Sequence, residues 1–322
     1  MNTSSATSAA AAEPETPPEP PAGPLRIAIT GVTGRLGSAL ARGLADAHQV
    51  IPLDRAALDL ARPGDLPAAL AGIRFDLLIN PAALTSPDAA EADPELARRV
   101  NALAPGVLAA CCRQRGARML HLSTDYVFGG RRPGLRGERC RPDPRGAYGR
   151  TKHAGELAVI DAHPAACIVR VSWLYGGGRP GFPEQVVARA RARTPLAAIA
   201  DKFSLPTRVD DLVAWIRALV AAPEVAGIVH ACPSGPPASW RDWALATLEA
   251  AVAAGRLDRL PPVAPLRLAE AGFFHSPRPR HTAMANRRLA ALLGTAPGDW
   301  RDALRAHVAS SLQAPGDFTI HR

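Results

Sequence analysis

Lysine is almost absent from this 322-residue sequence. Lysine and arginine together number 38, yet only Lys152 and Lys202 are lysines. The net charge is +9, but the arginines are spread along the chain without a block of like charge, and aromatic residues make up only 5%. Nucleic-acid binding usually needs a clustered basic surface, often with aromatic side chains that stack on bases. The sequence therefore predicts no nucleic-acid partner.

Paired cysteines and long apolar runs are also lacking. The five cysteines show no CxxC or Cys/His ligand spacing, and the histidines show no HxxxH or HxH pattern, which disfavours a disulfide framework or a metal site. No apolar run reaches the roughly 18 residues that a membrane-spanning helix needs. Residues 1–24 lack the basic start and apolar stretch of a secretory signal, and their Ala/Pro/Glu composition predicts a disordered tail. We expect a cytoplasmic globular protein without metal or membrane.

Short apolar runs alternate with amphipathic segments after residue 24. Residues 25–30, 49–54, 75–80, 118–124 and 166–175 have the composition of strands, and helices are expected between them. Strands that alternate with helices form parallel sheets covered on both faces. The sequence therefore predicts an α/β protein with a Rossmann-type doubly wound parallel sheet.

The pattern loosens beyond residue 175 and predicts a smaller, interleaved C-terminal lobe. We expect an NAD(P)-binding Rossmann domain over 25–175. Residues 176–322 should form mainly a substrate-binding lobe, with some segments returning to the Rossmann domain. Prolines indicate a loop at 261–265, and two helices should finish the chain.

Proline also marks local features within the first domain. Asp93 and Pro94 have the N-cap and N1 chemistry of a helix start. Pro105 lies inside the helical pattern that follows, so the sequence predicts a kink or a break into two helices there.

The glycine-rich stretch GVTGRLG, residues 31–37, follows the first strand and opens a helix. Glycines let the backbone turn sharply and approach a pyrophosphate, to which a helix N-terminus presents free N–H groups. The spacing is GxxGxxG, and its place between strand and helix favours dinucleotide binding over a purely structural turn. We expect cofactor contacts from Gly31, Thr33, Gly34, Arg35, Leu36 and Gly37.

The choice of cofactor depends on charges near the end of the second strand. Asp54 could accept a hydrogen bond from a ribose 2′-hydroxyl, whereas Arg35 and Arg55 could bind a 2′-phosphate. Two arginines against one aspartate favour NADPH, with NADH as the alternative.

A second group of residues could carry out proton transfer. Thr124 ends a strand, and Tyr148 and Lys152 are spaced four residues apart in a helical pattern, so they share one helix face. Thr124 would hydrogen-bond a carbonyl oxygen, to which Tyr148 would donate its proton. We expect the Lys152 ammonium to lower the pKa of the phenol. Lysine suits this place because it is a compact point charge, unlike the broad fork of arginine.

Several sequence blocks occur in a fixed order from Leu25 to the C-terminus, among them STDYVFGG, YGRTKHAGE and DKFSLPT. On these blocks the chain resembles the dTDP-4-dehydrorhamnose reductase family of the extended short-chain dehydrogenases/reductases. A dehydratase of the same superfamily would have TDE where this chain has TDY, at residues 124–126. The resemblance implies reduction of the C4 ketone of a deoxy-sugar nucleotide, most closely dTDP-4-dehydro-L-rhamnose.

The resemblance also implies roles for individual residues. Thr124, Tyr148 and Lys152 would form the catalytic triad, and Asn101 would support the site. Assembly into a homodimer is left open. Further contacts implied are Asp59 and Leu60 beside the adenine, Ala82 and Ala83 along the cofactor, and Trp173 and Arg278 at the nucleotide-sugar.

Three departures from the family pattern lie in loops expected to face the substrate. The stretch 131–145 is basic where relatives are usually acidic, and the family's DQxGxPT is DKFSLPT here, with Ser204 in place of a glycine. His281 replaces an asparagine. The exact nucleotide-sugar is therefore left open. Two other functions also stay open: an NADP-binding regulatory subunit like that of methionine adenosyltransferase, and a sugar-nucleotide epimerase.

Overall fold

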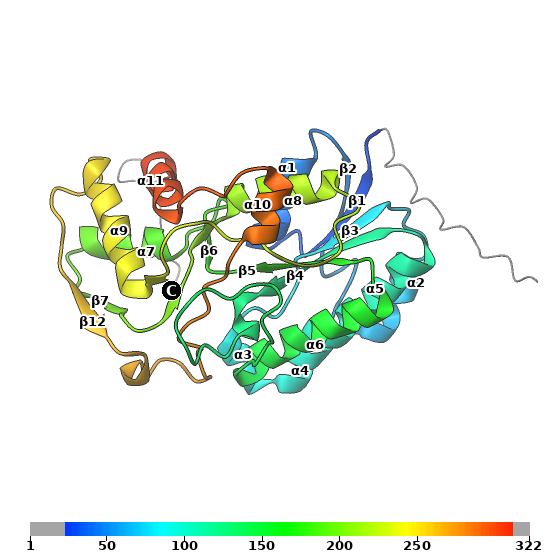
Figure 1. The fold of residues 1–322 in the computed structure, drawn as a ribbon, viewed down its shortest axis with the longest axis horizontal. Helices are drawn as coiled ribbons and strands as arrows, with labels where there is room; N and C mark the ends of the chain where they lie inside the picture. Colours follow the sequence, from blue (N-terminus) through cyan, green and yellow to red (C-terminus); the bar gives the residue numbers. More distant parts are fainter. Residues whose placement is uncertain (1–22, 312–322) are drawn as a thin grey trace, which may run out of the picture.

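The computed structural model describes residues 23–311 and has an α/β fold (Figure 1). Its central sheet is made of β1 (Arg26–Thr30), β2 (Gln49–Leu53), β3 (Leu77–Asn80), β4 (Arg118–Thr124), β5 (Cys167–Val171) and β10 (Gly227–His230). The strand order is β10-β5-β4-β3-β1-β2, and all neighbours pair in parallel. The order reverses between β1 and β3, which opens a crevice at their carboxyl ends. The predicted Rossmann-type sheet is confirmed.

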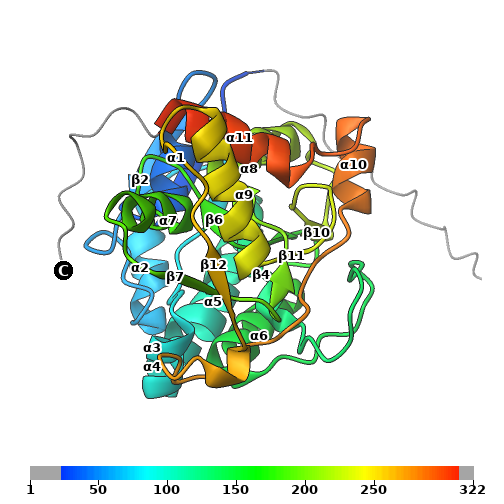
Figure 2. The same cartoon turned by 90° about the vertical axis from the view of Figure 1, so that its left-hand side faces the viewer.

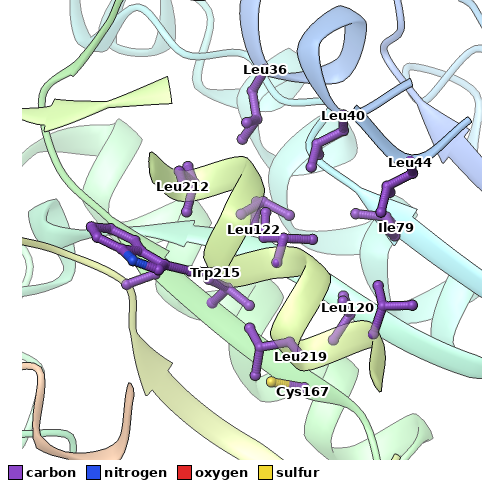
Figure 3. Packing of buried hydrophobic residues seen from close by; sticks show 14 of the residues in the cluster. Leu36, Leu40, Leu44, Ile79, Leu120, Leu122, Cys167, Leu212, Trp215 and Leu219 are labelled. Carbon is purple, nitrogen blue, oxygen red and sulfur yellow. The ribbon is translucent and has the colours of Figure 1, made fainter. Parts of the chain in front are cut away.

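Both faces of the sheet are covered because apolar residues of each strand point alternately to opposite sides. Ile27 and Ile29 of β1 belong to one buried layer, and Ala28 between them belongs to the other. Figure 3 shows the first layer, in which leucines spaced four residues apart on the first helix meet the side chains of the strands. The first layer is formed by α1 (Arg35–Leu44) and α8 (Val209–Ala221), and the second by α2 (Leu66–Leu70), α5 (Ala104–Gln114) and α6 (Gly146–Ala162).

The helical segment before β4 begins and divides where its sequence predicts. The Asp93 carboxylate accepts a hydrogen bond of 2.9 Å from the Leu96 N–H and caps α4 (Pro94–Arg98). A π-helical turn at Arg99–Leu103 then separates α4 from α5, in whose first turn Pro105 lies. Proline has no N–H to donate, and it is tolerated in the first turn of a helix. A short helix, α3 (Pro87–Ala92), precedes α4 and is capped by Ser86.

Most elements after residue 175 form a smaller group beside the central sheet. This group faces the viewer in Figure 2. One expected loop contains a strand instead. Residues 263–266 pair in parallel with residues 196–199, and Pro265 lies within this short ladder, opposite Ala198. The group contains α7 (Phe182–Arg191), β7 (Leu196–Ile199), α9 (Trp240–Ala253), β12 (Val263–Leu266) and α11 (Trp300–Ser311).

The strand expected over 166–175 is divided in two. β5 ends at Val171, and β6 (Leu174–Tyr175) pairs with β9 (Thr207–Arg208) outside the central sheet. Trp173 lies between them with a left-handed φ of +43°, which an extended strand cannot include. A further pair joins β8 (Phe203–Ser204) to β11 (Ala238–Ser239).

Parts of the C-terminal half return to the central sheet. β10 pairs with β5, α8 packs on α1, and α10 (Arg287–Leu293) adds Leu289 to the same buried layer. We therefore propose that the division near residue 175 separates cofactor binding from substrate binding, although the two parts share one sheet. In the part of the chain that the structure describes, no helix is both long and apolar enough to cross a membrane. The N-terminal tail expected at 1–24 lies almost wholly outside the described residues.

Candidate active site

The glycine turn between β1 and α1 needs glycine at two positions. Gly31 has a φ of +58°, and a Cβ there would lie 2.9 Å from the Cβ of Ala82. A Cβ at Gly37 would lie 2.2 Å from the carbonyl oxygen of Gly31, so a side chain would collide with backbone. Among residues 23–311, no side chain caps the N-terminus of α1. Its first N–H groups are therefore available to an anion.

A cavity of about 590 Å³ lies at the carboxyl ends of β1, β3, β4 and β5. It brings the glycine turn and the proposed catalytic residues into one space. Five predicted residues do not line it: Asp54, Arg55, Asp59, Leu60 and Arg278. The predicted residues that do line it are Gly31, Thr33, Gly34, Arg35, Leu36, Gly37, Ala82, Ala83, Thr124, Tyr148, Lys152 and Trp173.

Thr124, Tyr148 and Lys152 meet because β4 ends beside the first turns of α6. Thr124 is the last residue of β4, and its hydroxyl accepts a hydrogen bond of 3.2 Å from the Tyr126 N–H. Lys152 is buried, and its Nζ donates a 2.7 Å hydrogen bond to the Leu122 carbonyl of the same strand. One strand therefore fixes both the hydroxyl and the ammonium.

The pKa of the phenol does not follow the expected direction. Burial raises the pKa of Tyr148 to about 12, Asp125 adds to the rise, and a hydrogen bond with Thr124 opposes it. Burial likewise lowers the pKa of Lys152 to about 8, against the attraction of Glu156. The predicted lowering of the phenol's pKa by Lys152 is therefore wrong for this structure. The ammonium is bonded to a backbone carbonyl, and desolvation of the phenolate dominates.

Comparison with known proteins places the chain in a family. The family model of the RmlD substrate binding domain matches residues 25–313. The chain is 37% identical to dTDP-4-dehydrorhamnose reductase of Mycolicibacterium smegmatis, over 91% of this chain and 88% of the relative. The chain belongs to the dTDP-4-dehydrorhamnose reductase family. This confirms the predicted resemblance.

Two further relatives bear on substrate and cofactor. The chain is 38% identical, over 87% of its length and 94% of the relative, to a probable dTDP-4,6-dihydroxy-2-methyloxan-3-one 4-ketoreductase of Streptomyces antibioticus. The crystal structure of dTDP-4-dehydrorhamnose reductase from Bacillus anthracis in complex with NADP has a TM-score of 0.79 at 30% identity. The structural match covers 88% of this chain and 98% of the Bacillus anthracis chain.

The two arginines considered for a 2′-phosphate have different surroundings. Arg35 is committed to protein acceptors, because its guanidinium donates to the carbonyls of Gly176 at 2.6 Å, Arg179 at 2.6 Å and Pro180 at 2.8 Å. Arg55 has a side chain that is 82% exposed, and its Nε lies 3.5 Å from Asp59. Of these two arginines, only Arg55 could therefore turn to a ligand without breaking three hydrogen bonds to backbone carbonyls.

Asp54, considered for the ribose, and Asp59 and Leu60, which the family resemblance places beside the adenine, belong to the segment after β2. The Asp54 carboxylate accepts a hydrogen bond of 2.9 Å from the Ala57 N–H, and that of Asp59 accepts one of 3.1 Å from the Ala61 N–H. Leu60 is buried. β2 is the neighbour of β1 in the sheet, so this segment lies at the same edge as the glycine turn. Their contact with a cofactor stays a prediction.

Asn101 supports the loop that carries Ala82 and Ala83. Its side-chain amide accepts from the Leu84 N–H at 2.9 Å and donates to the Leu84 carbonyl at 3.1 Å. It also donates to the Thr151 hydroxyl at 3.3 Å, which links this loop to α6 beside Lys152.

The two residues implied for the substrate differ in position. Trp173 lines the cavity, and its ring lies 5.6 Å from that of Trp243. The Arg278 guanidinium is instead paired with Asp88 at 2.7 Å and lies 4.4 Å from the Phe274 ring. Arg278 does not line the cavity, and its predicted contact with a diphosphate stays a prediction.

Sequence reasoning did not identify three buried charged features around the site. The Asp125 carboxylate accepts a hydrogen bond of 2.8 Å from Ser204 and another from Thr282. Glu156 and Arg170 form a fully buried ion pair behind Lys152. Lys202 is also fully buried, and its rarity was a signal in the sequence. Within residues 23–311, no group of His, Cys, Asp and Glu could hold a metal ion.

Proposed function

We propose that the protein uses NADPH to reduce the C4 ketone of dTDP-4-dehydro-L-rhamnose, giving dTDP-L-rhamnose. The observation that carries the proposal is the single cavity in which the glycine turn meets Thr124, Tyr148 and Lys152. The names of the relatives support it, because both describe reduction of a ketone on a dTDP-linked sugar.

The residues present fit a nicotinamide dinucleotide. At Gly31 and Gly37 there is no room for a Cβ, so the backbone is bare where a pyrophosphate would meet the N-terminus of α1. Ala82 and Ala83 line the same cavity with small apolar side chains. When bound, the cofactor supplies the hydride for the ketone carbon.

The protein supplies the proton and the orientation of the ketone. The Thr124 hydroxyl donates to the Asp125 carboxylate at 3.2 Å in the structure, and it turns to donate a hydrogen bond to the ketone oxygen when the sugar is bound. The Tyr148 hydroxyl gives that oxygen its proton as the C–O double bond is reduced. A pKa of about 12 keeps Tyr148 protonated at neutral pH, which suits proton donation and hence the direction of reduction. Lys152, one helical turn away, holds its ammonium on the Leu122 carbonyl at the wall of the same cavity.

The relative from Streptomyces antibioticus favours a second candidate, reduction of another dTDP-4-keto sugar. Loss of NADPH absorbance with a panel of 4-keto sugar nucleotides tests both candidates. Oxidation of NADPH only with dTDP-4-dehydro-L-rhamnose would support the first, and a higher kcat/KM with another 4-keto sugar the second. A regulatory subunit would oxidise no NADPH with any ketone. An epimerase would interconvert sugars without net consumption of cofactor.

Replacing Arg55 with alanine is expected to weaken NADPH binding about fivefold and to leave NADH binding unchanged. The reason is that Arg55 is exposed at the end of β2, whereas the Arg35 guanidinium is bonded to three carbonyls. Fluorescence titration with each cofactor measures the two dissociation constants. The matched control is Arg62→Ala, which removes another exposed arginine of the same segment. Equal losses for NADPH and NADH would exclude a 2′-phosphate contact.

A further inference from the structure

Lys202 is a buried cation that the proposed reaction does not use. Its side chain is 0% exposed, in the loop segment just before β8. Its Nζ lies 4.8 Å from the centre of the Tyr126 ring and 5.2 Å from that of the Trp173 ring. Among the described residues, this Nζ has no hydrogen-bond partner. The faces of two aromatic rings thus lie within cation–π distance of this ammonium.

A buried ammonium without acceptors costs free energy, and its neighbours offset the cost only in part. Asp125 attracts Lys202, while Arg278 repels it. The Asp125 carboxylate, however, takes its hydrogen bonds from hydroxyl groups of Thr124, Ser204 and Thr282. Stability alone thus gives little reason for a lysine here, since an apolar side chain of the same length would fill the space without the desolvation cost.

The two rings beside Lys202 form part of the proposed active site. Tyr126 and Trp173 both line the cavity. The Tyr126 ring also meets the Tyr148 ring edge-on, at 5.5 Å and 72°. Tyr126 therefore stands beside the place where a ketone would accept a proton from Tyr148.

Trp173 is held in an unfavourable backbone conformation. Its φ of +43° is rare for a residue with a bulky side chain. Such strain persists only where surrounding contacts impose it. The Trp173 ring lies against Lys202, Trp240 and Trp243.

We propose that Lys202 is a positioning residue for the sugar-nucleotide, holding the Tyr126 and Trp173 rings by cation–π contact in the orientation that receives the sugar beside Tyr148. The inference rests on the proposed function, because it takes the ligand of this cavity to be a dTDP-linked sugar. Lys202 itself is covered by the two rings, so its effect on the substrate passes through them.

Lys202→Met tests the proposal, because methionine has a similar length and no charge. We expect KM for the sugar-nucleotide to rise roughly tenfold, since a desolvated cation–π contact is lost. The dissociation constant for NADPH should not change. The melting temperature should stay equal or rise, because a buried charge is removed. Arg301→Met is the matched control: it removes a cation 4.5 Å from the Trp300 ring, which does not line the cavity.

The pH dependence gives a second readout that a merely structural role would not move. Burial lowers the pKa of Lys202 to about 8, against the attraction of Asp125. The other charged or titratable groups facing it are Arg278, Tyr126 and His281. The charged form is lost as the pH rises, so the KM of the wild-type protein should increase through about pH 8. In Lys202→Met, the rise in KM that is caused by loss of the Lys202 charge should disappear.

The outcomes separate the proposal from its alternatives. A folded Lys202→Met protein with unchanged KM would overturn it. So would a lower melting temperature with equal weakening of NADPH and sugar-nucleotide binding, because that shows a structural role. If the wild-type protein reduces no sugar-nucleotide, the proposed function fails. Calorimetric binding of dTDP-L-rhamnose then decides: weaker binding to the variant supports the positioning role, and equal binding, or none to either protein, refutes it.

Discussion

Tyr148→Phe should lower kcat by roughly a thousandfold while NADPH binding and the melting temperature stay unchanged. The substitution removes only the hydroxyl that gives its proton to the ketone oxygen. Lys152 cannot replace it, because its Nζ is bonded to the Leu122 carbonyl. Steady-state rates with NADPH and the 4-keto sugar nucleotide, together with a cofactor titration, measure both quantities.

Tyr126→Phe is the matched control for this prediction. Tyr126 lines the same cavity and its ring contacts that of Tyr148, but it has no proton-transfer role in the proposed reaction. Its phenylalanine variant keeps the ring and should lose less than about tenfold in kcat/KM. Comparable losses in the two variants, or nearly full activity of Tyr148→Phe, would refute the role of Tyr148.

The parts of the fold that sequence predicts well are those fixed by local pattern. The apolar runs at 25–30 and 118–124 form β1 and β4, because alternate residues of each strand enter the two buried layers. The glycine turn is also visible in the sequence, because only glycine fits at positions 31 and 37, where a Cβ would collide with neighbouring atoms. The strand predictions that were wrong concern segments whose pairing partners are distant in the chain. β12 exists through its pairing with β7, and β6 separates from β5 to pair with β9.

The same distinction holds within the site. Residue types and spacing place Tyr148 and Lys152 on one helix face, and this is independent of other elements. Ion-pair partners are not local: Arg278 pairs with Asp88, 190 residues away. The direction of the pKa shift of Tyr148 also depends on burial, which spacing does not reveal.

The scarcity of lysine acquires a structural meaning. Both lysines of the chain, Lys152 and Lys202, are fully buried around one cavity, although lysine is among the residue types most rarely buried. The sequence singled out Lys152 because of its spacing to Tyr148. Lys202 carried the same signal of rarity, but its neighbours Tyr126 and Trp173 are distant in sequence, so only the fold brings them together.

Arg170→Met should destabilise the protein by about 3–5 kcal/mol, because it leaves the buried Glu156 carboxylate without its cation. Arg170 donates to the two carboxylate oxygens of Glu156 at 2.7 Å and 2.6 Å, and Ser123 donates at 2.6 Å. The pair ties α6 to β5 one helical turn beyond Lys152. Urea unfolding measures the loss. The double variant Arg170→Met/Glu156→Met should recover most of the stability, since it removes both buried charges.

The destabilisation by Arg170→Met should also depend on pH. Hydrogen bonds from Arg170 and His153, together with the Arg170 charge, lower the pKa of Glu156 to about 2 although burial opposes them. A lowered pKa in the folded state stabilises the protein above the unfolded pKa of about 4.3, and this contribution is lost as the pH falls through about 2. Without Arg170, burial dominates and the carboxyl group protonates more readily, which relieves the variant in acid. The difference in unfolding free energy between wild type and variant should therefore be largest near neutral pH and shrink in acid. A difference that stays constant with pH would show that lost packing, not the unpaired carboxylate, causes the destabilisation.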